Sequence, residues 1–143
     1  MVNREYLLEQ FRLAEEYLGR ARAIAGLSLQ EYLHDKNAVD ASVRQLTVLF
    51  ETCHNIGKHL ISRHDWRAPG SKAETFEILA EHAVLPSDLG NAFRGASRFR
   101  NLVTYQTTVV RDELVYEVLQ NHLTDFDRFL SCVARWLESE EPD

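Results

Sequence analysis

Residues 37–63 decide the fold, and they read NAVDASVRQLTVLFETCHNIGKHLISR. Apolar or small residues recur here in alternating steps of four and three, at Val39, Val43, Leu46, Phe50, Cys53, Gly57 and Leu60. This spacing places them on one face of an α-helix, which Leu49 and Ile56 widen. The stretch therefore predicts a long helix with a broad buried side.

Similar spacing predicts further helices on both sides of this one. They are expected over about residues 3–26, 72–82, 87–104 and 112–138, with a short helical turn after residue 28. Ser28 with Glu31, and Ser71 with Glu74, have the spacing of a capping box at a helix start. Gly26 is placed to end the first helix.

The pattern as a whole predicts an all-α protein. We expect an up-and-down bundle of four to five helices that forms a single domain over residues 1–143. The β-branched run from Thr107 to Val110 is expected to be an extended connector before the last helix.

Composition and charge narrow the class of protein. The chain is 45% hydrophobic and 27% charged, which is typical of a compact globular domain. Its net charge of −6 argues against broad electrostatic binding of nucleic acid, although a few placed arginines can still form a local basic cleft. No apolar run reaches the roughly 18 residues of a membrane span, and the first residues do not resemble a signal peptide. We therefore expect a soluble cytoplasmic protein that does not associate with membranes.

Several chemical motifs are missing from the sequence. His54 and His59 are five residues apart and so point about 140° apart on a helix, and no HExxH or paired CxxC is present, which argues against zinc. Cys53 and Cys132 lie in apolar helical patterns that favour reduced core thiols over a disulfide. Neither a glycine-rich phosphate loop nor a GxSxG nucleophile motif occurs.

The most polar part of a helix-patterned segment is residues 99–107, FRNLVTYQT. Arg100 and Asn101 stand side by side, Tyr105 follows five residues after the arginine, and Thr107 two residues later. One interpretation is that Arg100 and Asn101 cap a helix end, where a cation complements the helix dipole. The other is that this cluster is an active site.

The chain resembles the HepT-like branch of the HEPN superfamily, small all-α proteins that form the toxin half of HepT/MNT toxin–antitoxin pairs. The similarity runs from about Leu33 to Leu137. It includes the helix pattern of Ala41–Leu60 with Glu51 at an acidic position, and the segment 76–86, FEILAEHAVLP. Phe99-Arg100-Asn101 is similar to the start of the family motif R-x4-H-x-Y, and matches to the last helix follow at Val110, Val115, Tyr116, Leu119, Leu123 and Phe126.

The chain departs from this motif at its centre. Counted from Arg100 without a gap, Tyr105 stands at the position of the catalytic histidine and Thr107 at that of the modified tyrosine. A one-residue gap places Thr104 at the histidine position instead, but the ungapped register keeps Val110 and later residues aligned. In both registers the histidine is absent.

The resemblance implies a metal-independent endoribonuclease that needs no cofactor. Arg100 would bind the scissile phosphate and Asn101 would bind phosphate or ribose, or cap the helix. Tyr105 would weaken or abolish catalysis, because a tyrosine is a poor general base at neutral pH. Glu51 would orient Arg100 across the helix pair through its carboxylate, or is an exposed helix charge.

The resemblance also implies partners. These are a second copy of the chain, an MNT-type minimal nucleotidyltransferase antitoxin that transfers AMP to the motif tyrosine, and RNA if the chain is active. Tyr105 or Thr107 would then be the AMP acceptor. The large apolar surface of Phe126, Phe129 and Trp136 is compatible with a homodimer. The alternative function is an inactive HEPN module that binds nucleotide, RNA or the nucleotidyltransferase.

Overall fold

The computed structural model describes residues 2–105 and 109–140, together with the side chains in these ranges except those of residues 98, 100–105 and 109–110. The chain in these ranges forms seven helices and no strand. The helices are α1 (Arg4–Ala25), α2 (Leu29–His34), α3 (Lys36–Arg63), α4 (Lys72–Glu81), α5 (Ser87–Tyr105), α6 (Val109–Asn121) and α7 (Leu123–Glu140).

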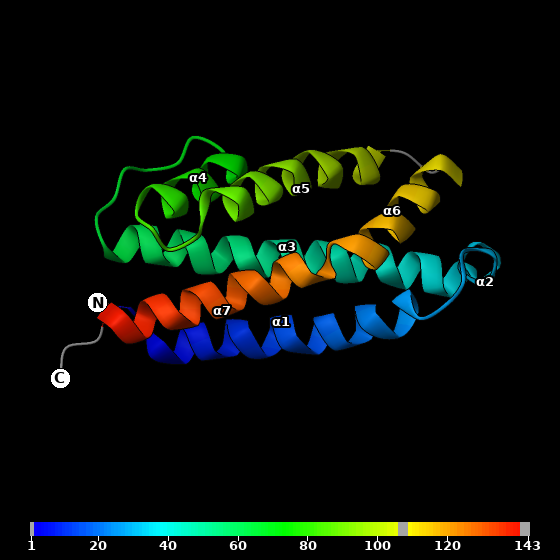
Figure 1. Cartoon of the computed structure of the whole chain (residues 1–143), viewed down its shortest axis with the longest axis horizontal. Coiled ribbons are helices and arrows are strands. Elements are labelled where there is room, and N and C mark those ends of the chain that lie inside the picture. The colour runs from blue at the N-terminus through cyan, green and yellow to red at the C-terminus, as the bar shows by residue number, and fades with distance from the viewer. Residues whose placement is uncertain (1, 106–108, 141–143) are drawn as a thin grey trace.

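Helix α3 is the centre of the bundle and contacts each of the other helices. Figure 1 shows α1 and α7 along one side of α3, α4 and α5 along the other, and α6 slanting across one end. Half of the 28 residues of α3 are buried, and they include Val39, Leu46, Phe50, Cys53 and Leu60 from the predicted stripe. The prediction of an all-α bundle organised by this helix is confirmed.

The helix starts follow the capping signals in the sequence. Ser28 and Glu31 form a complete capping box at the start of α2. Ser71 caps α4 by accepting the Glu74 N–H, but the Glu74 carboxylate accepts the N–H of Gly70 at 3.0 Å rather than that of Ser71. Gly26 caps the end of α1. Short-range sequence signals were therefore sufficient to place these boundaries to within about two residues.

The C-terminal part differs from the prediction in two ways. Val109 and Val110, expected in an extended connector, begin helix α6, while the other two residues of that connector, 107 and 108, lie outside the described chain. The single helix expected over residues 112–138 is interrupted at His122 and forms α6 and α7. The Asp125 N–H donates to the His122 carbonyl at 3.1 Å, and the Asp125 carboxylate lies 3.1 Å from the His122 ring. These contacts start α7 without a glycine or proline to signal the break.

Two hydrogen bonds hold α6 against the end of α1. The Tyr116 hydroxyl donates to the Leu27 carbonyl at 2.7 Å, and the Gln120 amide donates to the Ala25 carbonyl at 2.7 Å. Carbonyls at the end of a helix have no partner within it, so they need donors from elsewhere. Tyr116 and Gln120 supply these donors, so α6 is held against α1 and does not continue along the axis of α7.

Helices α3 and α4 end in the same way, each with a non-glycine residue in the left-handed region. Asp65 has a φ of 54° and Ala83 a φ of 61°. The N–H of the following residue reaches back five positions in each case, from Trp66 to the Ile61 carbonyl and from Val84 to the Leu79 carbonyl. This is the hydrogen bond of a Schellman motif, in which the chain reverses over the last helical turn. Because the chain reverses after α3, the Trp66 side chain packs against the end of the bundle.

Trp66 organises an aromatic cluster that closes one end of the bundle. Its ring stacks on His82 with centroids 3.9 Å apart and on His64 at 4.9 Å. Trp136 of α7 meets Trp66 edge-on at 5.6 Å. The loop after α3 is thereby packed against α4 and α7.

The aromatic residues of α7 do not form an exposed surface, which corrects the sequence-based argument for a dimer. Phe126 is 5% exposed and Phe129 is fully buried, and both rings pack on Phe93. Trp136 is half-buried in the aromatic cluster described above. Helical spacing identifies an apolar face correctly but does not reveal whether this chain or a second one covers it.

Both cysteines are free, as predicted. Cys53 is buried in α3, and this burial raises the pKa of its thiol. Within the described ranges, no helix combines the length and the apolar character that crossing a membrane requires.

Helices α3 and α4 pack tightly at Gly57, where a Cβ would lie 2.9 Å from Leu79 Cδ1 and 3.0 Å from Thr75 Cγ2. Both neighbours are fully buried, so they have little space to move. We expect Gly57→Ala to lower the free energy of unfolding by about 1 kcal/mol, because overpacking exceeds the gain in helix propensity. Urea unfolding followed by circular dichroism measures this change.

Gly19→Ala in α1 is the matched control, because a Cβ there meets nothing within 4 Å. It is expected to raise the free energy of unfolding by about 1 kcal/mol through helix propensity alone. Equal stabilisation by both substitutions would contradict the tight packing at Gly57.

Candidate functional site between helices α3 and α5

The polar cluster found in the sequence lies at the end of α5. Arg100 and Asn101 are in the last two turns of this helix and Tyr105 is its final residue. The helical backbone separates Arg100 from Tyr105 by about 1.4 turns. The side chains of these three residues, and the whole of Thr107, lie outside the described part of the structure.

The turn before Arg100 is anchored on the middle of α3. Phe99 and Ala96 pack against the core, and they face Thr47 and Phe50 of α3 across a narrow space of about 40 Å³. Since α5 and α3 meet here through apolar side chains, this contact fixes the position of the motif backbone relative to α3.

Close packing against α4 fixes the first half of α5. A Cβ at Gly90 would lie 3.2 Å from the Cβ of Ala80, so the two helices nearly touch. Three residues later, Phe93 stacks on Phe76 of α4 with ring centroids 4.7 Å apart. These contacts set the register of α5, and with it the place of Arg100 along the bundle.

Glu51 lies on α3, next to Phe50, and is partly exposed. Its carboxylate accepts a hydrogen bond from the Lys72 ammonium at 2.7 Å, with side chains that are 32% and 38% exposed respectively. Ion pairs with this exposure contribute about 0–1 kcal/mol to stability. The sequence predicted an orienting role toward Arg100. That role stays a prediction, because the arginine side chain is outside the described part.

The sequence did not indicate Lys72 as a partner of Glu51. The two residues are 21 positions apart and meet only because α4 folds back onto α3. Lys72 is the first residue of α4. No local spacing rule connects them, so sequence reasoning had no signal with which to find this pair.

His54 is a buried ionisable residue, and its spacing in the sequence had argued against a role as a zinc ligand. It lies one helical turn after Glu51, is 8% exposed, and its ring centroid is 6.3 Å from that of Phe76. Its burial is explained by the broad apolar face of α3. Within the part of the chain that is described, no three His, Cys, Asp or Glu side chains group as metal ligands.

A second polar cluster lies where α2, α3 and α6 meet. Arg111 pairs with Asp112 at 2.7 Å, and both side chains are less than 15% exposed. The nearby Tyr32 hydroxyl is bonded to Ser42 Oγ at 2.7 Å, and burial raises the pKa of this tyrosine. The Arg111–Asp112 pair lies within α6 and the Tyr32–Ser42 bond joins α2 to α3, while the rings of Tyr32 and Tyr116, with centroids 5.3 Å apart, bring α2 and α6 together.

Charge at the start of α5 is largely neutralised by local pairs. Arg94 pairs with Glu77 of α4 at 3.1 Å, and Asp88 pairs with Arg128 of α7 at 3.1 Å. All four side chains are between 38% and 68% exposed, so these pairs add little stability.

Comparison with known proteins agrees with this arrangement. A curated relative, the mRNA nuclease HepT of Shewanella oneidensis, is 22% identical over 103 residues, which cover 72% of this chain and 77% of that protein. The tri-AMPylated HEPN toxin of the same organism, solved in complex with its MNT antitoxin, superposes with a TM-score of 0.83 at 19% identity, covering 91% of this chain and 97% of that one.

A third similar structure is YutE of Bacillus subtilis, a cytosolic protein of unknown function. It has a TM-score of 0.81 at 20% identity and covers 97% of this chain and 93% of that one. At these identities the structural likeness establishes a common fold. The decisive comparison is with the family model for ribonuclease HepT-like proteins, which matches residues 14–133. The chain therefore belongs to the ribonuclease HepT-like family.

Proposed function

We propose that the protein is the toxin component of a HepT/MNT-type toxin–antitoxin pair and acts on RNA as a metal-independent endoribonuclease of reduced activity. The observation that carries this proposal is the family match over residues 14–133 together with Arg100 at the first position of the family motif. The mRNA nuclease activity named for the curated relative supports the choice of RNA as the substrate.

Arg100 is the residue that binds the scissile phosphate in this proposal. A guanidinium is planar and always charged, and it donates two parallel hydrogen bonds to phosphate oxygens. The chain as a whole carries a charge of −6, so RNA binding depends on such placed cations rather than on the overall field. Asn101 adds a neutral hydrogen bond to phosphate or ribose.

Tyr105 limits the rate of cleavage. Proton transfer by a positioned histidine accelerates such reactions by about 10²–10⁴-fold, and a tyrosine, with a pKa near 10 when unperturbed, is a poor general base at neutral pH. The presence of Tyr105 in place of the motif histidine also supports the second candidate function. This is a HEPN module that binds RNA, a nucleotide or the nucleotidyltransferase without cutting. Both candidates use Arg100 for phosphate binding and differ in whether any bond is broken.

An MNT-type nucleotidyltransferase is the proposed protein partner. The similar toxin from Shewanella oneidensis is AMP-modified and was solved with its MNT antitoxin, which supports a pairing of the same kind here. In this chain Thr107 occupies the place of the modified tyrosine, and Tyr105 is two residues away. These two hydroxyls are the proposed AMP acceptors.

A homodimer is part of the proposal, because the family cleft requires the motif of two chains. The sedimentation coefficient is expected to correspond to a particle of twice 16.5 kDa at micromolar concentration. Analytical ultracentrifugation tests this, and a monomer at all accessible concentrations would remove the shared cleft from the mechanism.

Cleavage is tested by incubating the purified chain with total RNA in EDTA. Replacing Arg100 with Ala is expected to abolish cleavage, since phosphate binding is lost. Tyr105→His is expected to raise the cleavage rate by about 10²–10⁴-fold, because it restores a group that titrates near neutral pH. Product formation on denaturing gels, followed over time, measures both effects.

Arg94→Ala is the matched control, because Arg94 lies on the same helix but is paired with Glu77. This variant is expected to cleave RNA at the rate of the unmodified chain. If Tyr105→His cleaves no RNA, the nuclease proposal fails and the binding module remains. If Arg100→Ala cleaves as fast as the unmodified chain, the assigned site is wrong.

The proposed role of Glu51 in orienting Arg100 is tested by comparing substitutions of Glu51 and of its ion-pair partner, Lys72. Glu51→Gln and Lys72→Gln each remove the same 2.7 Å ion pair, so a role of Glu51 that is confined to this pair predicts equal effects. If Glu51 orients Arg100, Glu51→Gln lowers kcat about tenfold in the Tyr105→His background, with KM nearly unchanged, while Lys72→Gln changes neither. Steady-state cleavage of a short RNA measures the two constants. Equal constants for the two variants would leave Glu51 a structural residue only.

A further inference from the structure

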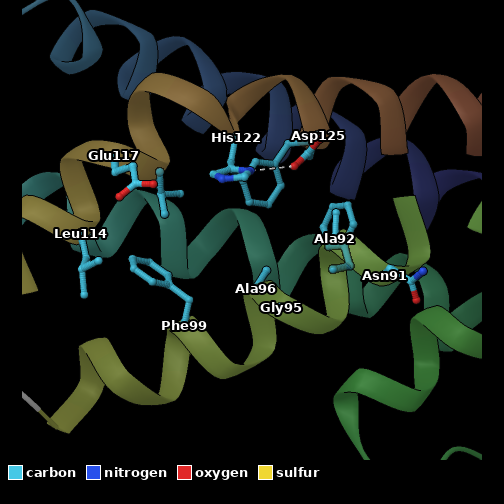
Figure 2. A pocket seen from close by; sticks show the side chains of 12 residues that line it. Asn91, Ala92, Gly95, Ala96, Phe99, Leu114, Glu117, His122 and Asp125 are labelled. Atoms are coloured by element: carbon cyan, nitrogen blue, oxygen red, sulfur yellow. Dashed lines mark hydrogen bonds and ion pairs between the residues drawn. The ribbon is translucent and has the colours of Figure 1, made fainter. Parts of the chain in front are cut away.

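A cavity of about 400 Å³ lies between α5, α6 and α7. Figure 2 shows its lining side chains, with α5 on one side and the end of α6 and start of α7 on the other. Phe93 and Phe126 form its floor and are 1% and 5% exposed.

Small residues on α5 create this cavity. Ala92, Gly95 and Ala96 face it, and a Cβ added at Gly95 would meet nothing within 4 Å. On the opposite side, the break at His122 directs α6 toward α1, to which its Tyr116 and Gln120 are hydrogen-bonded. Small side chains and a diverging helix together leave a gap that the chain itself does not fill.

Along α5, the lining residues of the cavity run from Asn91 to Phe99, which lies on the turn that precedes Arg100. One helical turn before Asn91, the Asp88–Arg128 ion pair joins α5 to α7 at 3.1 Å. We call this cavity the chamber.

The rim of the cavity is acidic. Glu117 and Asp125 both line it, as does His122, whose ring lies 3.1 Å from the Asp125 carboxylate. No lysine or arginine is among the residues that line the chamber in the described chain. Glu117 and His122 are exposed, whereas the aromatic floor is buried, so the charge lies at the opening and the apolar surface lies inside.

We infer that this chamber is a binding site for a small organic cation with an aromatic body, such as an arylalkylamine. Apolar cavities of about 150 Å³ hold a benzene ring, and ligand pockets begin at about 300 Å³, so a one- or two-ring molecule fits. Its ring system packs between Phe99, Phe126 and the α5 alanines. Its ammonium group lies at the rim, where Glu117 and Asp125 attract it.

A macromolecular occupant fits these observations less well. An amphipathic helix or a second chain needs an extended apolar surface around its anchor residues. The large hydrophobic side chains that are exposed in the described chain are Leu8, Leu13 and Leu29, on α1 and α2. None of them lines the chamber, at whose opening Glu117 and His122 are exposed.

The test uses three indole compounds of similar size and different charge, namely tryptamine, tryptophol and indoleacetate. Tryptamine is expected to bind with a dissociation constant of about 1 mM or lower, about tenfold tighter than neutral tryptophol, and indoleacetate more weakly than either. Isothermal titration calorimetry measures affinity. Chemical-shift changes of backbone amides, centred on Gly95, locate the site. Both readouts are independent of RNA cleavage.

Two variants separate the chamber from nonspecific binding. Gly95→Leu places a side chain into the open space and is expected to weaken tryptamine binding at least tenfold. Its matched control is Gly19→Leu on α1, which also enters open space and leaves binding unchanged. Glu117→Gln is expected to reduce the preference for tryptamine over tryptophol to less than about threefold, because one rim charge is removed.

Three results would each overturn the inference. The first is equal affinity for the three compounds, or no saturable binding of any. The second is full retention of tryptamine binding by Gly95→Leu in a folded protein, as judged by its circular dichroism and its amide spectrum. The third is a dimer of the unmodified chain that Gly95→Leu dissociates, because the chamber would then be filled by a second copy.

Discussion

Burial of α3 is the constraint on which the other helices depend. Its broad apolar face is too wide for one neighbour to cover, so α1, α4, α5, α6 and α7 each take part of it. Because Gly57 lacks a side chain, α4 can approach closely enough for Thr75 and Leu79 to be fully buried. The same α4 then supports α5 through the stacked rings of Phe76 and Phe93. Helix α3 thus positions α4, and α4 in turn positions α5.

In the proposed reaction, phosphate binding and proton transfer place different demands on the helix packing. Phosphate binding requires a charge in roughly the right place, and the packing of Phe99 against α3 fixes where the backbone of Arg100 lies. Proton transfer requires a group with a suitable pKa within hydrogen-bond reach, which is more demanding. A chain can therefore lose its histidine and keep the helix, the arginine and the ability to hold RNA.

Local periodicity predicted the helices and most of the core, because a helix buries the side chains that recur every three to four residues. Val115, Leu119 and Phe126 are buried as that spacing requires, although the helix is interrupted between them at His122. The interruption was missed because no glycine or proline marks it. The Glu51–Lys72 pair was missed because it depends on how α4 folds back. The apolar side chains of Phe126 and Phe129, which the sequence analysis offered as compatible with a homodimer, are buried within this chain, since periodicity does not say which chain covers a face.

Helix α1 begins and α7 ends at the same end of the bundle, whereas α5 ends and α6 begins at the opposite end (Figure 1). A protein or affinity tag joined to either terminus therefore projects away from the motif backbone. This geometry allows fusion proteins to report on RNA or partner binding without occupying the surface under study.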